Sequence, residues 1–417
     1  MSTAPRNDVL ILGGGVIGLS CALALLRASR GVTIVEQNTI GSGSSHGNCG
    51  TITPSHLPLN APGTIEKALK WLLQADAPLR IAPTLDLTRL AWLLRFAGQC
   101  TPERYAATAR TKLALLQASR ARLSTLINDE GLDCEFVDSG TMYVWHSAAG
   151  FDAAEAEYRM LRRLGVAIER FDGASARAKE PALNDRIVGG HWHPDDARLR
   201  PDRYVAELRR RVVELGGVII EHAEVTGFRG DGQRLTGVET TRGDYTADHF
   251  VYALGAWSPR LGRALGLRLP IQPGKGYSIT YSRPAQPPTI PLVLKERSVC
   301  VTSWASGYRL GSTMEFAGYD TTLNRTRLDA LTRGAAEYLR EPLGPAVEEE
   351  WYGWRPMTWD DLPIIGPAPG LQNLTLATGH GMLGVSLSAI TGALVAAGVT
   401  GSEAPLDPVP YLPRRFY

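Results

Sequence analysis

Three glycines near the start of the chain have the spacing that a diphosphate-binding turn requires. Gly13, Gly15 and Gly18 spell G-x-G-x-x-G between an apolar run that predicts a buried strand, residues 8–12, and an apolar helix, residues 16–28. The first glycine permits a tight turn, the second lets backbone approach a pyrophosphate, and the third lets helix and strand pack closely. The helix N-terminus offers free N–H groups and a favourable dipole to the anion. The residues expected there are Gly13, Gly15, Val16, Ile17 and Gly18.

An acidic residue follows the second predicted strand, residues 32–35. Glu36 lies about 18 residues after Gly18, where a carboxylate accepts hydrogen bonds from both hydroxyls of a ribose. The same carboxylate would repel a 2′-phosphate. This order of elements, a strand, a glycine turn, a helix, a second strand and an acidic residue, predicts a dinucleotide site. We expect the site to include Glu36 and Gln37.

The loop after Glu36, residues 39–50, favours FAD over NAD. Its sequence, GSGSSHGNCG from residue 41, places the hydroxyls of Ser44 and Ser45 near the expected pyrophosphate. Small residues such as Asn48 suit a backbone that lies against a flat ring. An NAD-dependent dehydrogenase has no special need for this loop, but it remains an alternative, and it would be colourless rather than yellow.

A second G-x-G-x-x-G occurs near the C-terminus, between a predicted strand, residues 375–377, and a predicted helix, residues 382–397. Glu403 follows at about the right distance, but the remaining sequence is polar and proline-rich, so we expect no second strand and no separate NAD site. We expect instead that this helix N-terminus points at the flavin pyrimidine, where reduction places negative charge. The residues concerned are Gly379, Gly381, Met382, Leu383 and Gly384.

The elements that must position these residues predict an α/β protein (α+β, two domains). A Rossmann-like FAD-binding domain is expected to be interleaved with a β-rich substrate domain, because nucleotide-binding patterns come from the start, middle and end of the chain. The FAD-binding domain is predicted to comprise residues 1–62, 140–265 and 355–417. Residues 63–139 predict a helical insertion, and residues 266–354 the β-rich domain.

Composition excludes several classes of protein. The chain has 417 residues, a net charge of +2 and 21% charged residues, which does not indicate a nucleic-acid binder. Its five cysteines show no metal-ligand spacing, so we expect no metal site and reduced thiols in a cytoplasmic setting. No signal peptide is expected, and glycines interrupt the apolar run of residues 9–26. A peripheral contact with the inner face of the membrane stays open.

Several motifs, spread over nearly the whole chain, resemble one family. They are GGGVIGLS, SSHGNCG followed by TPSHLPLNAPG, YALGAWS, GKGYSIT, WYGWRPMTWDDLPIIG and GHGMLGVSLSAITG. Together they resemble the D-amino-acid oxidase superfamily of flavoproteins, which includes glycine oxidase and sarcosine oxidase. The bacterial D-amino acid dehydrogenase branch is the most similar. The last two motifs are specific in combination.

The resemblance implies an extended, non-covalently bound FAD whose ring is covered by the β-rich domain. By position, the backbone of Val225 should contact the adenine, and Gly255 and Trp257, in the ALGAWS turn, should pass the pyrophosphate. The segment that should skirt the isoalloxazine consists of Asn48, Cys49, Gly50, Thr51 and Ile52. Some relatives attach the flavin to a histidine near His46, but the spacing here fits the non-covalent branch.

Three residues are candidates for the substrate pocket. Arg355, in WRPMT, matches the arginine that pairs with the substrate carboxylate in the family, and a planar guanidinium suits that task. Tyr277, in GKGYS, is a candidate second ligand to the carboxylate or the amine, or alternatively a core tyrosine. His56 is a candidate lining residue.

The family reaction transfers a hydride from the carbon that bears the amine to the flavin. The branch implies a D-amino acid as substrate, and the similarity around SSHGNCG points to a cyclic imino acid such as D-proline or hydroxy-D-proline. Electrons would pass to a quinone or another acceptor. A glycine- or sarcosine-type amine oxidase that uses oxygen is the alternative. A third alternative is a flavin-bearing subunit or a tRNA-modifying protein, which clusters of basic residues would favour. The basic run at residues 209–211 is instead expected to be a solvated face of a helix.

Overall fold

The computed structural model describes residues 7–74 and 77–417. Its first sheet is built from segments far apart in sequence, as expected of a Rossmann-like domain. Its strands pair in parallel except for β19, which is antiparallel to β20 at one edge. In spatial order they are β19 (Ile364–Pro367), β20 (Leu374–Thr378), β13 (Ala247–Tyr252), β1 (Asn7–Leu12), β2 (Val32–Val35) and β9 (Val218–Ile220).

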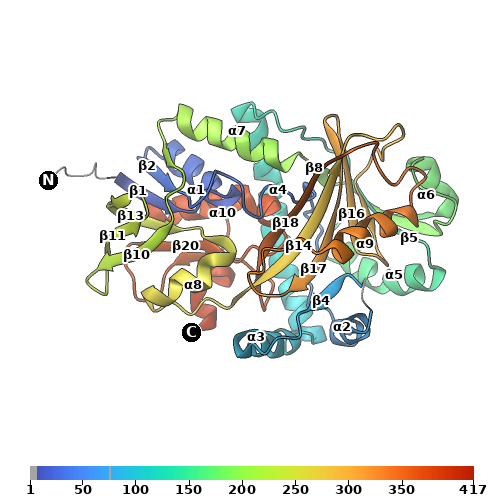
Figure 1. The fold of residues 1–417 in the computed structure, drawn as a ribbon, viewed down its shortest axis with the longest axis horizontal. Coiled ribbons are helices and arrows are strands. Elements are labelled where there is room, and N and C mark those ends of the chain that lie inside the picture. Colours follow the sequence, from blue (N-terminus) through green and yellow to red (C-terminus); the bar gives the residue numbers. More distant parts are fainter. Residues whose placement is uncertain (1–6, 75–76) are drawn as a thin grey trace.

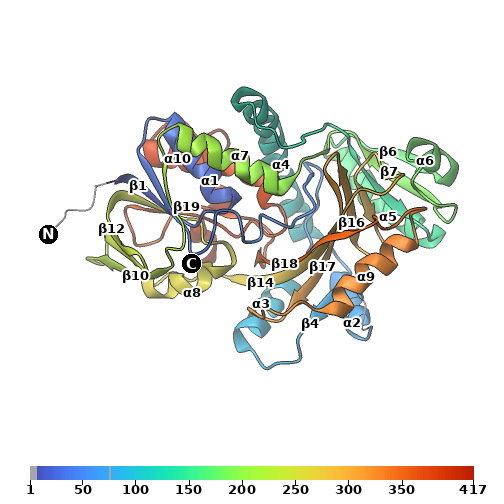
Figure 2. The ribbon, with the colours of Figure 1, turned by 45° about the horizontal axis from the view of Figure 1, so that its top comes forward.

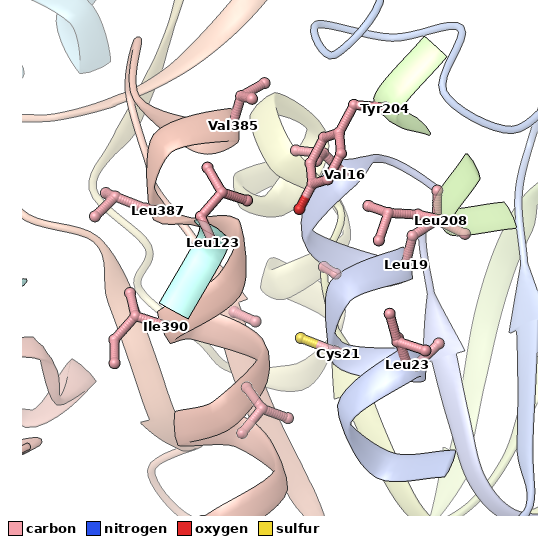
Figure 3. Packing of buried hydrophobic residues seen from close by; sticks show 14 of the residues in the cluster. Val16, Leu19, Cys21, Leu23, Leu123, Tyr204, Leu208, Val385, Leu387 and Ile390 are labelled. Carbon is pink, nitrogen blue, oxygen red and sulfur yellow. The ribbon is translucent and has the colours of Figure 1, made fainter. Parts of the chain in front are cut away.

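Apolar helices cover one face of this sheet. The helix that follows the glycine turn, α1 (Val16–Arg27), packs against α7 (Pro201–Glu214) and α10 (Gly384–Thr400). A side chain at Gly392 would place its Cβ 2.4 Å from the Ser20 carbonyl oxygen, so α1 and α10 approach at backbone distance. Figure 3 shows the apolar side chains between them. A small three-stranded sheet lies on the other side: β10 (Val225–Gly230), β11 (Leu235–Thr240) and β12 (Gly243–Tyr245).

The second sheet forms a separate body beside the first, as Figures 1 and 2 show. Its core is a long antiparallel set in which β14 lies between β18 and β17, and the helix α9 (Arg325–Ala336) packs against β14, β16 and β17. Its strands are β18 (Val347–Thr358), β14 (Ile271–Tyr281), β17 (Gly307–Phe316), β16 (Val299–Trp304), β15 (Leu292–Leu294), β5 (Thr141–Trp145), β7 (Gly189–His193) and β6 (Glu169–Asp172), with β4 (Leu79–Ile81) beside β17. Helices α5 (Ala148–Arg163) and α6 (Gly173–Lys179) lie at its far end.

The two-domain α/β architecture is confirmed, but the division of the chain differs from the prediction in two places. The strands β5, β6 and β7 belong to the second sheet, because β5 pairs in parallel with β15. Residues 140–196 therefore do not lie in the FAD-binding domain. The helix α4 (Pro102–Glu130) is not part of a separate insertion, since its apolar face packs on α10 in the first core.

Two shorter helices of the predicted insertion, α2 (Thr64–Leu72) and α3 (Leu87–Ala97), lie outside both cores. None of the side chains of α2 is buried, and only Arg89 and Trp92 are buried in α3. No helix in residues 7–74 or 77–417 is long and apolar enough to cross a bilayer.

Candidate active site

A cavity of about 720 Å³ lies between the two sheets. Its walls include the glycine turn before α1, the loop after β2, the N-terminus of α10, and the inner ends of β14, β16 and β18. Ligand pockets in proteins commonly measure about 300–1,000 Å³. One cavity therefore joins the expected dinucleotide site to the expected substrate site.

The glycine turn leaves the N-terminus of α1 open to an anion. Gly13 has a φ of +104°, and a Cβ there would lie 2.5 Å from the Ala253 carbonyl oxygen, so only glycine fits. The hydroxyl of Ser45 accepts a hydrogen bond of 3.0 Å from the N–H of Val16. This places a neutral polar group beside the first turn of the helix, on the wall of the cavity. The arrangement fits a diphosphate held by backbone N–H groups and a serine.

Glu36 lies at the end of β2 as predicted, and backbone donors hold its carboxylate. Its Oε2 accepts from the N–H of Gly14 at 2.7 Å, and its Oε1 accepts from the N–H of Asn38 at 3.0 Å. Each carboxylate oxygen can accept a second hydrogen bond, which leaves capacity for two sugar hydroxyls. Gln37 and Val225 line the same end of the cavity, which fits an adenosine.

Most of the residues predicted to bind the cofactor line the cavity. They are Gly13, Gly15, Val16, Ile17, Glu36, Gln37, Ser44, Ser45, Asn48, Cys49, Thr51, Val225, Gly255, Trp257, Gly381, Met382, Leu383 and Gly384.

Four residues predicted to bind the cofactor do not line the cavity. Gly18 is a packing residue, because a Cβ there would meet the Gly13 carbonyl oxygen at 1.9 Å. A Cβ at Gly50 would lie 2.0 Å from the Leu199 carbonyl oxygen, and Gly379 turns the chain at a φ of +75°. Ile52 belongs to the first hydrophobic core. These four residues therefore support the cavity wall without lining it.

Arg355 lines the cavity from β18 and has no acidic partner among the described residues. Its Nη1 donates to the Thr313 carbonyl oxygen at 2.6 Å. Its guanidinium lies flat over Gly276 of β14, where a Cβ would approach the Arg355 Cζ to 2.3 Å. Burial lowers the pKa of the guanidinium, the direction expected of a cation without a counter-ion. Such a guanidinium can pair with an anionic ligand in the cavity.

A distortion of β17 aims the Thr313 carbonyl at that guanidinium. The pairing of β14 with β17 shifts register between Lys275 and Tyr277. On the bulged side, Ser312 has a φ of 124° and Thr313 a φ of 54°, values that side-chain-bearing residues rarely adopt. Backbone strain of this kind collects at ligand sites, because the surrounding sheet holds it in place. The Thr313 carbonyl oxygen that accepts from Arg355 thus belongs to the distorted part of β17.

Tyr277 lines the cavity from β14, and its hydroxyl has a hydrogen-bond partner within the second sheet. Its hydroxyl donates to Glu315 Oε2 at 2.6 Å, and Glu315 is also paired with Arg80. The ring belongs to the second hydrophobic core, and the residue is 1% exposed. The hydroxyl proton is thus engaged by Glu315, which favours the alternative of a core tyrosine, while the side chain still borders the cavity.

His56 lines the cavity, and its Nδ1 has no partner within the described part of the chain. Burial, and then the nearby charges of Lys112 and Lys295, lower the pKa of His56 to about 3. The imidazole is therefore neutral at physiological pH. His46, by contrast, is paired outside the cavity lining with Glu349, its Nε2 lying 2.7 Å from Oε1.

Sequence reasoning missed several residues of the cavity wall. Tyr143 comes from β5, whose residues were assigned to the wrong domain, Lys295 lies in the turn after β15, and Lys67 comes from α2. Cys300 and Tyr352 face the cavity from β16 and β18. Tertiary packing of distant segments brings them together, so local sequence patterns could not place them on one cavity wall.

Comparison with known proteins gives one consistent family. Residues 8–397 match the family model described as FAD dependent oxidoreductase, DAO. The chain belongs to this family. It is therefore an FAD-dependent enzyme, and the glycine turn, Ser45 and Glu36 are in place for that cofactor.

Similar proteins span the whole length of the chain. D-amino acid dehydrogenases of Granulibacter bethesdensis and Allorhizobium ampelinum are 32% and 33% identical to it, over 96% of this chain and 97% and 96% of theirs. The crystal structure of glycine oxidase from Geobacillus kaustophilus superimposes with a TM-score of 0.79 at 24% identity, covering 98% of both chains. L-proline dehydrogenase from P. horikoshii gives a TM-score of 0.76 at 19% identity, over 99% of this chain and 98% of that one. The two structural likenesses show the fold.

Proposed function

We propose that this enzyme oxidises a D-amino acid whose carboxylate binds Arg355, with FAD as the electron acceptor in the cavity. The observation that carries the proposal is a partly buried guanidinium that has no acidic partner among the described residues and lines the same cavity as the glycine turn. A buried cation is costly unless it is paired, so the position favours an anionic ligand. The name shared by the similar full-length proteins, D-amino acid dehydrogenase, supports the substrate class.

The roles of the chain's own residues follow from their contacts. Arg355, held by Thr313 and lying on Gly276, can donate two parallel hydrogen bonds to a carboxylate. That fixes the orientation of the adjacent carbon, and orientation is the main contribution of a protein to cofactor chemistry. FAD, when bound, supplies the acceptor for the hydride that leaves this carbon. The neutral His56 can accept a hydrogen bond from the substrate amine without adding charge.

A cyclic imino acid, D-proline or a hydroxy-D-proline, is the narrower proposal for the substrate. The proposal is supported by the segment SSHGNCG and the TPSHLPLNAPG motif that follows it, where the sequence resembles the D-amino acid dehydrogenase branch. This part of the chain contributes Thr51, Thr53, His56 and Leu59 to the cavity wall.

We propose that the electrons pass to a membrane-dissolved quinone. The helices α2 and α3 carry an exposed apolar face, and α2 also supplies Lys67 to the cavity wall. Exposed apolar patches of this kind mark contact surfaces for membranes or partners. The leucine face consists of Leu69, Leu72, Leu73, Leu85, Leu87, Leu90 and Leu94, which are 43–90% exposed.

The test is anaerobic bleaching of the purified yellow enzyme by a panel of substrates. The panel pairs D- and L-proline, D- and L-alanine and both hydroxyproline enantiomers, and adds glycine and sarcosine. We expect the D-enantiomers to bleach the flavin and the L-enantiomers to leave it oxidised. Faster bleaching by glycine or sarcosine than by any D-amino acid would support the amine-oxidase alternative instead. Repeating the assay with oxygen and with a short-chain quinone identifies the acceptor.

A further inference from the structure

Two cysteines from distant parts of the chain meet on the wall of the cavity. Cys49 comes from the loop after β2, and Cys300 from β16. Cys300 is directly opposite Gly311 in the antiparallel pairing of β16 with β17. Opposed residues in such a pair have Cα atoms about 4.5–5.5 Å apart. A Cβ on Gly311 would lie 2.5 Å from the Cys49 sulfur. The Cys49 thiol therefore fills the space that a side chain at Gly311 would take, next to Cys300.

The two thiols are close enough to influence each other, and their surroundings make them chemically unequal. Their interaction is the largest influence on each group; it lowers the pKa of Cys300 and raises that of Cys49. The positive charges of Arg355 and Lys295 also lower the pKa of Cys300, while burial opposes the shift. Nucleophilic cysteines have this setting: a partly accessible thiol with cationic neighbours and a second thiol within reach.

We propose that Cys49 and Cys300 form a redox-active pair that closes to a disulfide on reaction with hydrogen peroxide. The Cys300 thiolate attacks one peroxide oxygen, the O–O bond breaks, and hydroxide leaves, which produces a sulfenic acid on Cys300. The Cys49 sulfur then attacks the Cys300 sulfur and displaces hydroxide, which takes up the Cys49 proton and leaves as water. The first hydroxide becomes water with the proton that Cys300 lost when its thiolate formed. Two thiols and one peroxide thus give one disulfide and two waters. A small dithiol such as dithiothreitol reverses the change by exchange.

Closure would alter the substrate site, because both sulfurs lie near Arg355. The charge of Arg355 acts on Cys49 as well as on Cys300. Arg309 donates to the carbonyl oxygen of Asn48 at 2.8 Å, which anchors the loop that carries Cys49. A disulfide would tie this loop to β16 and remove the S–H donor beside the guanidinium. We expect weaker substrate binding in the oxidised enzyme, restored by dithiothreitol.

The primary test uses the holoenzyme without substrate, so it is independent of the proposed reaction. The enzyme is treated with a small excess of hydrogen peroxide and analysed by thiol titration and intact mass. We expect two of the five thiols to disappear, with a mass decrease of two hydrogen atoms. Proteolysis should yield one linked peptide pair containing Cys49 and Cys300, which dithiothreitol separates. Retention of all five thiols, or a gain of oxygen without a linked pair, overturns the proposal.

Three variants separate the pair from general oxidation. In Cys49→Ser the reaction should stop at a sulfenic acid on Cys300, which a dimedone probe traps. Cys100→Ser, a change outside the cavity lining, should still form the linked pair. Gly311→Ala keeps both thiols but displaces the Cys49 sulfur, so the yield of the linked peptide should fall at least tenfold. A linked pair at wild-type yield in Gly311→Ala would contradict the geometry. The flavin absorbance of each variant reports whether it has folded.

Discussion

The most specific structural prediction concerns Gly276, which has no side chain and lies beneath the Arg355 guanidinium. A methyl group there would lie 2.3 Å from the Arg355 Cζ, whereas carbon atoms in contact need about 3.5–4.0 Å. In Gly276→Ala the guanidinium must therefore move by more than about 1 Å. A displacement of that size at a reacting centre costs about 100-fold in rate, or about 2.7 kcal/mol of transition-state stabilisation.

The assay is the rate of anaerobic flavin reduction by the best substrate of the panel, followed by stopped-flow absorbance. We expect kcat/KM for Gly276→Ala to fall about 100-fold while the flavin stays bound, because Gly276 does not line the dinucleotide end. The matched control is Gly398→Ala, on the exposed side of α10, where an added Cβ meets nothing within 4 Å. A Gly276→Ala enzyme within twofold of wild type would refute the placement of Arg355.

Three further predictions follow from the cofactor site, the buried histidines and the leucine face. Glu36→Ala should lower the affinity for FAD at least tenfold, as measured by the flavin retained after dialysis, because two sugar hydroxyls lose their acceptor. Burial lowers the pKa of three histidines to about 3, so the unfolded chain binds more protons, and stability falls as the pH drops from about 6.5 towards 3. The three histidines are His56, His193 and His380. Each can change the free energy of unfolding, measured with urea, by up to about 1.4 kcal/mol per pH unit. Leu73→Glu should reduce co-sedimentation with lipid vesicles, whereas Leu215→Glu on α7's C-terminal end should not, and equal binding of both variants would contradict the membrane contact.

One buried carboxyl opposes the histidine effect and has to be allowed for. Burial raises the pKa of Asp196 to about 8, so this group is protonated in the folded state, and its contribution falls as the pH rises from about 4 to 8. Its Oδ1 accepts from the Ser55 hydroxyl at 2.9 Å. In Asp196→Asn, the free energy of unfolding should therefore rise more steeply with pH than in the wild-type enzyme, because only the histidine contribution remains. A flat profile there would contradict the burial of neutral histidines.

The dinucleotide half of the site could be predicted from sequence because its determinants are local. Gly13, Gly18 and Glu36 lie within one strand–helix–strand unit, so spacing alone fixes their relative positions. The structure adds the physical reason for each glycine: a Cβ at Gly13 or at Gly18 would collide with a carbonyl oxygen. Arg355 was indicated by its motif, and it lines the cavity as expected.

The substrate half could not be predicted in the same way, because long-range strand pairing decides which side chains face the cavity. Every residue of β14 is buried, so its sequence shows no alternation that would distinguish the face of Gly276 from the face of Tyr277. The strand β18 was not anticipated, since VEEEWYGWRPMT mixes charges with aromatics. The assignment of residues 140–196 failed for a related reason: β5 finds its parallel partner, β15, about 150 residues later.

The central claim is that Arg355 recognises the carboxylate of the substrate, and comparing a D-amino acid with its amide tests this most directly. D-alanine and D-alaninamide differ in the charged group but not in the carbon that is oxidised. We predict that the wild-type enzyme is reduced at least 100-fold faster by the acid than by the amide, and that Arg355→Ala reduces this preference to near unity. Equal rates with acid and amide in the wild-type enzyme, or an unchanged preference in Arg355→Ala, would contradict the claim.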